Sequence, residues 1–349
     1  MPSRFPLTDP TPLFEHFRGI HATELLTAAV AHFGVFEHLA VGPLSAAELQ
    51  RRLELADRPF VVLTTALRAM QVLAQNSSGE FCLTDLATEH LTDGTDFDVS
   101  GYIGLAAQNP SVLGMVERLR TNRPYGAEPK SAAGTAFIFR EGTTSAMEQA
   151  ASARRLTLSL AGRAKNVAPY LAERLSLPDA RTLLDVGGGT GIYAYALLRR
   201  NPNLRAIILD RPEVLKVAAE CAAQWQVADR VEFLSGDMFL TAFPTVDVVL
   251  LSNVLHDWDV AECRQLVKRA HDALTPGGQV VIHDVFLNDE LDGPLPVALY
   301  SASLFSLTEG RAYSAAEYRD WLTAAGLVPQ PVVPTLVHCG VLSARRSGP

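Results

Sequence analysis

Short apolar runs alternate with amphipathic stretches throughout the second half of the sequence, and this pattern limits the possible folds more than any other feature. The runs are rich in Val, Ile and Leu and lie at residues 182–186, 206–209, 231–234, 246–251 and 279–286. Strands that alternate with helices form a parallel sheet covered by helices on both faces. We therefore predict a doubly wound α/β domain. Apolar segments at 328–333 and 337–344 predict an antiparallel hairpin that completes it.

The first half of the sequence has the periodicity of helices instead. Apolar residues recur at helical spacing over residues 13–33, which predicts one amphipathic helix or a pair. A short helix should start near Ala46, because Ser45 can cap it and Glu48, three residues on, completes a capping box. A further helical pattern then ends at the turn over residues 76–79 and leads into a short hairpin. This order of elements predicts a winged-helix module.

The length of the chain favours two domains. Its 349 residues exceed the roughly 250 to 300 at which a single hydrophobic core stops growing. A helix-favouring stretch over residues 145–175 ends before Pro178-Asp179, where the rhythm changes. We therefore expect a mainly helical winged-helix domain at residues 1–177 and a doubly wound, Rossmann-like domain at residues 178–349.

The charge of the first half argues against nucleic acid as a partner. Residues 1–150 hold 11 Lys and Arg against 17 Asp and Glu, and the first lysine is Lys130. A winged helix often binds DNA, but an acidic module repels phosphate. We therefore favour dimerisation over DNA binding for this module.

The remaining composition indicates a soluble, cytoplasmic protein. The N-terminus has no short apolar run like that of a secretory signal, and no stretch approaches the roughly 20 apolar residues that span a bilayer. The cysteines are scattered without a CxxC pair, so we expect them to be packing residues and not parts of a disulfide framework or a zinc site. They are Cys82, Cys221, Cys263 and Cys339.

A glycine-rich turn follows the first predicted strand, in the sequence LLDVGGGTG at residues 183–191. The dinucleotide pattern G-x-G-x-x-G would begin at Gly187 and Gly189, but the last glycine comes one position early, at Gly191, which disfavours NAD. Asp185 would repel a pyrophosphate but suits an ammonium group. The alternative for the glycines alone is an ordinary turn between a strand and a helix.

Carboxylates also follow the next two predicted strands. Asp210 lies about 20 residues beyond the turn, where a carboxylate can accept hydrogen bonds from ribose hydroxyls. Asp237 follows the strand at 231–234 and could accept from an adenine amino group, with Met238 packed on the ring. The carboxyl ends of parallel strands form the ligand-binding edge of such a sheet. These residues therefore predict a nucleoside cofactor with an amino-acid-like tail.

The fourth and fifth predicted strands bring histidines and further aspartates to the same edge. His256 follows the strand at 246–251, and we interpret it as a general base, although a lone histidine is often structural. His283 and Asp284 lie on the fifth strand, and Asp284 could orient His256 and stabilise its protonated form. A mononuclear iron or zinc site is the alternative for these residues. Because no local metal-binding spacing such as HExxH is present, we expect no metal.

The sequence resembles, over nearly its whole length, the class I S-adenosylmethionine-dependent O-methyltransferases of the plant caffeate and flavonoid type and their bacterial secondary-metabolite relatives. The resemblance rests on four segments in the family order and spacing. They are DVGGGTG at residues 185–191, Asp210, GDM at residues 236–238 and HDW at residues 256–258.

The resemblance implies an enzyme that binds S-adenosylmethionine and methylates a hydroxyl of a small, aromatic secondary metabolite. It also implies a homodimer formed through the N-terminal domain, which would cap the substrate site. His256 would be the base, and Asp284 would take the place of a supporting glutamate. Ser252 stands where the family has a lysine near the adenine, and it can donate a hydrogen bond but brings no charge. Ala312 stands where a second glutamate is common.

These departures leave two other functions open. The first is a relative that keeps S-adenosylmethionine but carries out hydroxylation or pericyclic chemistry. The second is a winged-helix regulator that senses a small molecule, and the acidic first half argues against it. The substrate itself is not readable, because the expected pocket-lining helices lie around Tyr102 to Met147 and Leu299 to Phe305, where the sequence specifies no shape.

Overall fold

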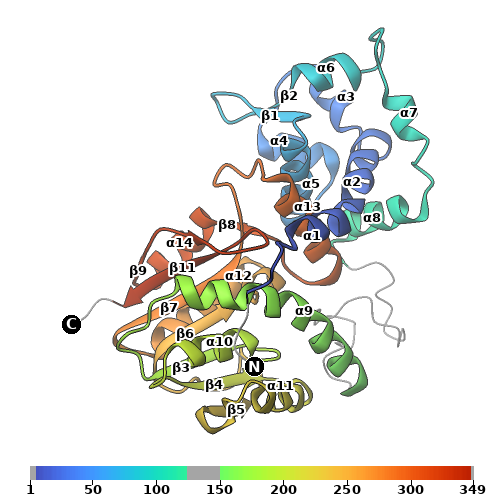
Figure 1. Cartoon of the computed structure of the whole chain (residues 1–349). Coiled ribbons are helices and arrows are strands. Elements are labelled where there is room, and N and C mark those ends of the chain that lie inside the picture. The colour runs from blue at the N-terminus through green and yellow to red at the C-terminus, as the bar shows by residue number, and fades with distance from the viewer. Residues whose placement is uncertain (1–4, 124–149, 347–349) are drawn as a thin grey trace. The chain divides into compact units, whose positions relative to one another are not determined.

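The computed structural model describes residues 5–123 and 150–346 (Figure 1). The chain divides into two compact units, each of which is built from separate stretches of sequence. Within the described residues, the sheet unit comprises 5–12, 150–286 and 315–346, and the helical unit comprises 13–123 and 287–314.

The sheet unit is built on a mostly parallel sheet in the order β10-β11-β7-β6-β3-β4-β5. Strands β3 to β7 run parallel, and β11 adds to β7 in the antiparallel direction. The chain moves from β3 outward to β5 and then returns to β6 on the other side of β3, so the strand order reverses between β3 and β6. Such a switch point opens a crevice where ligands bind. The strands are β3 (Thr182–Val186), β4 (Arg205–Asp210), β5 (Val231–Ser235), β6 (Val246–Ser252), β7 (Leu274–Leu287), β9 (Leu327–Pro329), β10 (Val333–Pro334) and β11 (Cys339–Arg346).

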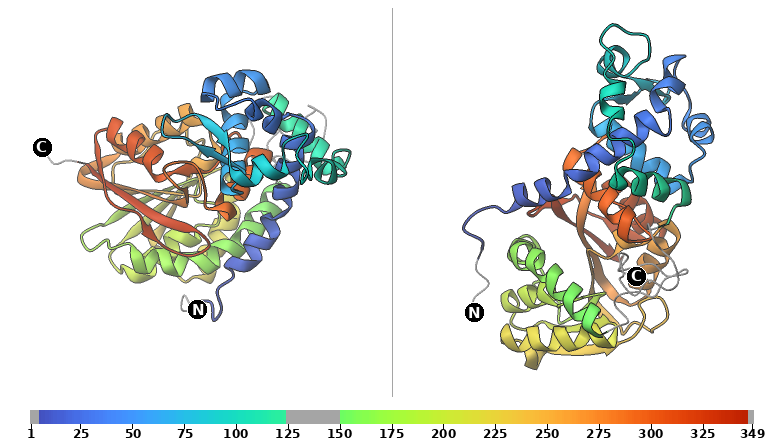
Figure 2. Two further views of the ribbon diagram at one scale, coloured as in Figure 1. Left: turned by 90° about the horizontal axis from the view of Figure 1, so that it is seen from above. Right: turned by 90° about the vertical axis from the view of Figure 1, so that its right-hand side faces the viewer.

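Helices cover both faces of this sheet, which is why its central strands are continuously apolar. Nearly every residue of β6 and the second half of β7 is buried, although successive residues point to opposite faces. Helices α9 to α11 and helix α14 lie on opposite sides of the strands (Figure 2). The helices of this unit are α9 (Ala150–Arg174), α10 (Ile192–Arg200), α11 (Pro212–Gln224), α12 (Val260–Asp272) and α14 (Ala315–Ala324), with short 3₁₀ turns at Ala228–Arg230 and Leu255–Asp257. The predicted α/β fold is confirmed.

The helical unit contains the predicted winged-helix elements. Ser45 caps α4 by accepting a hydrogen bond from Glu48 N at 3.3 Å, whereas the Glu48 carboxylate binds Arg51 and Arg52. The hairpin β1–β2 is extended by a bridge between Leu44 and Phe81. The elements are α1 (Thr11–Arg18), α2 (Ile20–Ala31), α3 (Val35–Ala40), α4 (Ala46–Leu53), α5 (Asp57–Ala69), β1 (Leu73–Gln75), β2 (Phe81–Leu83), α6 (Asp85–His90), α7 (Ser100–Gly104), α8 (Pro110–Thr121), α13 (Leu295–Leu307) and the two-residue β8 (Tyr313–Ser314).

The two units divide the chain differently from a single boundary after residue 177. Helix α9 belongs to the sheet unit, where it packs on α10 and α11. Residues 287–314 return to the helical unit, where the apolar helix α13 packs on α5 and α2. The chain passes between its two units several times. The local periodicity of apolar residues does not predict where these passages occur. Of the predicted pocket-lining helices, residues 124–147 lie outside the described residues.

The predicted C-terminal hairpin forms with one change. Its first strand is split into β9 and β10, and both pair antiparallel with β11. Prolines at 329, 331 and 334 explain the split, because each lacks the N–H that a continuous ladder needs. Within the part of the chain that the structure describes, no helix has the length and apolarity required to cross a bilayer. The four cysteines are free thiols, and three of them are buried.

Candidate active site

The glycine-rich turn joins β3 to α10 and folds tightly over the end of β4. Gly187 N and Gly188 N both donate to the carbonyl of Leu209, at 2.8 and 3.3 Å. A Cβ atom on Gly188 would lie 2.8 Å from Oδ2 of Asp185, so only glycine fits there. Gly189 has a φ of +58°, and the space around its missing Cβ is open. The turn therefore exposes backbone at the switch point of the sheet, and Gly191 is the N-cap residue of α10.

Asp185 lies beneath this turn in an unusual electrostatic state. It is 1% exposed, and neither of its carboxylate oxygens has a hydrogen-bond partner among the residues that the structure describes. Burial, reinforced by the charge of Asp210, raises the pKa of Asp185 to about 8. A buried carboxyl group without donors is costly unless a ligand supplies them. An ammonium group would supply both the charge and the donors.

Asp210 ends β4 and contacts the same turn. Its Oδ2 accepts a hydrogen bond from Gly189 N at 2.8 Å, and its Oδ1 accepts one from Arg211 N at 2.7 Å. Burial raises the pKa of Asp210 and outweighs these two backbone hydrogen bonds, which lower it. Each carboxylate oxygen can accept a second hydrogen bond, so Asp210 can still receive the two hydroxyls of a ribose.

Asp237 and Met238 follow β5, the next strand along this edge. Asp237 is tied into its loop, because Oδ1 accepts from Phe239 N at 2.8 Å and Oδ2 lies 3.1 Å from Nη2 of Arg211. Met238 lies beside the glycine turn, since its Cε atom is 3.9 Å from the position of a Cβ on Gly187. Both residues therefore lie at the predicted edge, and their contacts with a cofactor remain a prediction.

Ser252 ends β6 and belongs to a buried polar chain that the sequence did not reveal. Its Oγ lies 2.8 Å from Nδ1 of His283, and Nε2 of His283 lies 3.3 Å from Oγ1 of Thr335. Asn253 donates to the same Ser252 oxygen at 3.2 Å. Burial lowers the pKa of His283 to about 3, so this histidine is neutral and serves as a hydrogen-bonding spacer. The ring of Tyr193 packs edge-on against it.

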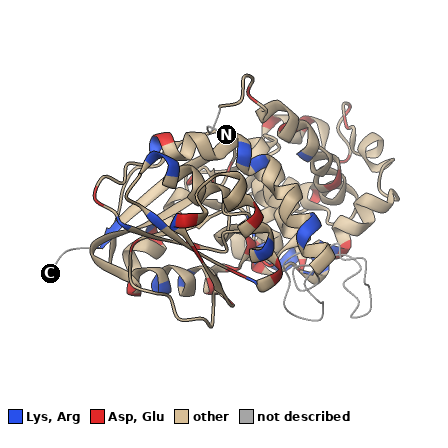
Figure 3. Ribbon diagram, turned by 60° about the horizontal axis from the view of Figure 1, so that its bottom comes forward, with Lys and Arg blue, Asp and Glu red and all other residues tan. Residues whose placement is uncertain are grey.

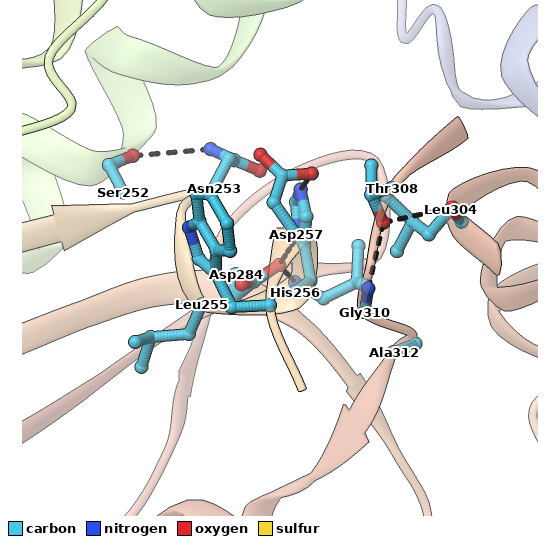
Figure 4. A network of polar contacts seen from close by, with 12 residues as sticks. Ser252, Asn253, Leu255, His256, Asp257, Asp284, Leu304, Thr308, Gly310 and Ala312 are labelled. Atoms are coloured by element: carbon cyan, nitrogen blue, oxygen red, sulfur yellow. Dashed lines mark hydrogen bonds and ion pairs between the residues drawn. The ribbon is translucent and has the colours of Figure 1, made fainter. Parts of the chain in front are cut away.

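His256 and Asp284 form the closest polar contact of the site (Figure 4). Nδ1 of His256 lies 2.5 Å from Oδ1 of Asp284, and both residues are buried. His256 is held in a short 3₁₀ turn after β6, and Asp284 lies on β7 beside it in the parallel sheet. Adjacent strands therefore bring the two residues together, as the sequence predicted. His283 is excluded from this pair because successive residues of β7 point to opposite faces.

The two members of this pair stabilise each other's charged forms. Burial lowers the pKa of His256, but the charges of Asp284 and Asp257 outweigh it, so the pKa of His256 is raised above its ordinary value. Burial raises the pKa of Asp284, but the attraction of His256 and the hydrogen bonds to the carboxylate outweigh it, so its pKa is lowered. Asp284 is therefore an ionised partner that supports a protonated His256.

Two residues of the site were not found from the sequence. Tyr318, on α14, donates to Oδ2 of Asp284 at 3.2 Å. Asp257 places its Oδ1 3.7 Å from Nε2 of His256, and burial raises the pKa of Asp257 to about 7. Asp257 directly follows His256 in the sequence, so its closeness to His256 could have been predicted. Tyr318 lies 34 positions from Asp284, and no local pattern links the two.

Ala312, which occupies the place of a second glutamate, belongs to the helical unit. It is fully buried, and its N–H donates to Oγ of Ser301 at 3.1 Å. The nearby loop is closed by Thr308, whose hydroxyl donates to Leu304 O and accepts from Gly310 N (Figure 4). The described residues contain no group of three or more His, Cys, Asp or Glu side chains that could hold a metal ion.

Comparison with known proteins identifies the family. The family model for the O-methyltransferase domain matches residues 117–328, which is more than half of the chain. The chain belongs to the O-methyltransferase family. This enzyme is 34% identical over 322 residues to the 3-hydroxy-5-methyl-1-naphthoate 3-O-methyltransferase of Streptomyces sahachiroi, covering 91% of this chain and 89% of that protein.

Solved structures agree with this assignment. The O-methyltransferase is similar to a family 2 O-methyltransferase of Planctomyces limnophilus, solved in complex with apigenin, with a TM-score of 0.88 and 49% identity over 98% of each chain. It shares its fold with human N-acetylserotonin methyltransferase, solved in complex with S-adenosylmethionine, with a TM-score of 0.59 and 21% identity over 96% of each chain.

The protein is therefore an S-adenosylmethionine-dependent O-methyltransferase, as predicted from the sequence. The residues of its sheet edge fit the cofactor. Asp185 has two buried oxygens that lack donors, and the cofactor carries an ammonium group. The glycine turn leaves open space beside Gly189, where a bulky ligand can approach the backbone. When bound, the cofactor supplies an electrophilic methyl group on a sulfonium.

Proposed function

We propose that this O-methyltransferase methylates a hydroxyl group of a small aromatic molecule and that His256 is its general base. The observation that carries the proposal is the contact of 2.5 Å between Nδ1 of His256 and Oδ1 of Asp284. The ionised carboxylate can only accept, so Nδ1 carries the proton, and the lone pair of the neutral ring lies on Nε2, the nitrogen that can take a proton from a substrate hydroxyl.

The proton affinities support such a role. A phenol has a pKa of about 10 and an unperturbed histidine one of about 6.5, so complete proton transfer before methyl transfer would cost about 5 kcal/mol. The raised pKa of His256 narrows this difference. Proton removal during methyl transfer, with Asp284 stabilising the imidazolium as it forms, lowers the cost further. The rate should rise with pH as His256 loses its proton, with a midpoint above 6.5.

An aromatic hydroxyl is the substrate class that the relatives support. One relative is named for methylating a hydroxynaphthoate, another is a tetracenomycin polyketide 8-O-methyltransferase, and a third was solved with the flavonoid apigenin. A phenol also matches the chemistry of the pair, because its oxygen needs a base near neutral pH whereas an already ionised acceptor does not.

We also propose a homodimer formed through the N-terminal helices. Large apolar side chains are exposed along the start of the chain, including Leu13, Phe17 and Ile20, of which Phe17 is 82% exposed. Apolar groups that cluster at a surface are typical of an interface. The DNA-binding alternative has no comparable support, because Lys and Arg are scattered among Asp and Glu along the described chain (Figure 3).

Single-turnover methylation tests the role of His256. With a phenol confirmed as substrate and S-adenosylmethionine at saturation, His256→Ala should lower the rate by ~10² to 10⁴, as expected for the loss of a general base. Affinity for S-adenosylhomocysteine should be nearly unchanged. His271→Ala is the matched control, because His271 lies on α12, is partly exposed and pairs with Asp272. Equal rates for wild type and His256→Ala would refute the proposed base.

A further inference from the structure

The carboxylate of Asp284 receives hydrogen bonds from three directions. Oδ1 accepts from Nδ1 of His256 at 2.5 Å and from the backbone N–H of Val285 at 2.8 Å. Oδ2 accepts from the hydroxyl of Tyr318 at 3.2 Å. Asp284 and Tyr318 are both 0% exposed as whole residues, so water does not compete for these contacts. Among the residues that the structure describes, the tyrosine hydroxyl therefore engages Oδ2, the carboxylate oxygen that does not contact His256.

Tyr318 is itself held rigidly by aromatic packing within the sheet unit. Its ring meets Phe286 edge-on at a centroid distance of 5.6 Å, and it meets Trp321 edge-on at 5.3 Å. Phe286 lies two residues beyond Asp284 on β7, and Trp321 lies one turn beyond Tyr318 on α14. The hydroxyl therefore approaches Asp284 from a fixed direction set by the packing of α14 on the sheet.

We propose that Tyr318 is a positioning residue that orients the Asp284 carboxylate toward His256 and shares its negative charge. The proposal rests on the proposed function of His256 as general base. Rotation of an aspartate carboxylate about its Cβ–Cγ bond is soft, with broad minima. Hydrogen bonds to both oxygens fix this rotation, so that Oδ1 stays in line with Nδ1 of His256.

If Tyr318 shares the charge of Asp284, removing its hydroxyl should change the pKa of His256, which a purely packing role would not do. A hydrogen bond donated to a carboxylate stabilises its charged form and weakens its attraction for a neighbouring proton. The carboxylate of Asp257 also raises the pKa of His256 and the guanidinium of Arg163 on α9 lowers it, and a variant that lacks only the tyrosine hydroxyl keeps both groups. When the hydroxyl is removed, Asp284 should attract the imidazolium more strongly, and the pKa of His256 should rise. At the same time the carboxylate gains freedom to rotate, and fewer molecules hold His256 in its reactive orientation.

Tyr318→Phe removes only the hydroxyl, and Tyr195→Phe is its matched control. Tyr195 is equally buried in the same unit, and its hydroxyl donates to the carbonyl of Ala218 on α11 at 2.9 Å and not to the pair of His256 and Asp284. Both variants lose one buried hydrogen bond, so both should lose similar thermal stability. Only Tyr318→Phe should change the titration of His256.

The titration can be measured without turnover, by NMR of protein labelled at the histidine Cε1 position. The resonance of His256 is assigned from its absence in His256→Ala. We expect Tyr318→Phe to raise the pKa of His256 by roughly half a unit to one unit. A shift of this size corresponds to part of the free energy of a charged hydrogen bond. An unchanged or lowered pKa overturns the proposal. Because this readout needs no substrate, it tests Tyr318 even if His256 proves not to be the base.

Kinetics provide the second arm of the test. Tyr318→Phe should lower kcat by roughly threefold to tenfold with little change in the KM for S-adenosylmethionine, and the acid limb of its pH profile should move upward. In an Asp284→Asn background the same substitution should have no further effect on kcat, because the two residues act through one hydrogen bond. Additive effects on kcat would assign Tyr318 to packing alone and overturn the proposal.

Discussion

Replacing Asp185 with asparagine should stabilise the cofactor-free protein, although Asp185 lies in the predicted cofactor site. Its pKa is raised to about 8 by burial and by the nearby charge of Asp210. In the unfolded chain the same carboxyl group titrates near its ordinary value of 3.8. At pH 7 the group must therefore take up a proton when the protein folds, and this uptake opposes folding.

The magnitude follows from the two pKa values. Between 3.8 and pH 7 lie about three pH units, and each unit corresponds to 1.36 kcal/mol, so the cost is about 4 kcal/mol. Asparagine avoids this cost but buries an amide without partners, which costs about 1 to 3 kcal/mol. The net gain in the free energy of unfolding at pH 7 should be about 1 to 3 kcal/mol.

The effect of Asp185→Asn on the free energy of unfolding depends on pH in a defined way. A group whose pKa is raised on folding costs nothing at a pH below its unfolded pKa, and the cost grows until the folded pKa is reached. The advantage of Asp185→Asn over wild type should therefore be absent near pH 4 and should increase up to pH 8. Urea unfolding followed by circular dichroism at several pH values measures this difference.

Asp247 provides a control of opposite sign in the same sheet. It lies at the start of β6, and its Oδ2 accepts hydrogen bonds from Arg181 N and from both the N–H and the hydroxyl of Thr182. Burial raises its pKa, but these donors and Thr275 outweigh it, so the pKa is lowered. Asp247→Asn should destabilise the protein at pH 7. If Asp185→Asn also destabilised it, with no dependence on pH, Asp185 would be an ionised and partnered carboxylate, and our account of it would be wrong.

Three further predictions concern the proposed site. The affinity for S-adenosylhomocysteine should rise up to about tenfold per pH unit between pH 6 and 7.5, because Asp185 must lose its proton to pair with the ligand ammonium; calorimetry of Asp185→Asn should show no such slope. Asp210→Ala should weaken binding of S-adenosylhomocysteine by a few kcal/mol, since charged hydrogen bonds are worth about 1.5 to 3 kcal/mol each, and an unchanged dissociation constant would remove Asp210 from the ribose role. Asp284→Asn should lower the single-turnover rate, but by less than His256→Ala does, and should lower the midpoint of the pH profile because the imidazolium loses its partner; a raised midpoint would contradict this.

The features that could be predicted from the sequence are those that depend on neighbouring residues. Strands β3, β6 and β7 were found because burial on both faces makes them almost continuously apolar. The edge carboxylates were found because residues that follow parallel strands meet at one edge. The pairing of His256 with Asp284 follows from the same rule, since β6 and β7 are adjacent and parallel.

The features that were missed depend on contacts between distant segments. Thr335 reaches His283 from the C-terminal strands, 52 positions away. The assignment of residues 287–314 to the helical unit depends on the packing of α13 on α5. Neither contact leaves a periodic or compositional signal in the sequence. Each one involves only a few side chains, and the residues next to them in sequence take no part in the contact.

Two buried aspartates near the same sheet edge show how the fold tunes one chemical group for two roles. Asp284 has three donors, and its pKa is lowered; Asp185 has no partner among the described residues, and its pKa is raised. A carboxylate that must stabilise a cation formed during the reaction performs best when it is already ionised and oriented, because no reorganisation is then required. A carboxylate that must bind a cationic ligand gains most when it has no other partner, because the ligand then relieves the cost of burial. On this reasoning, we propose that Asp284 acts in the chemical step and that Asp185 acts in cofactor binding.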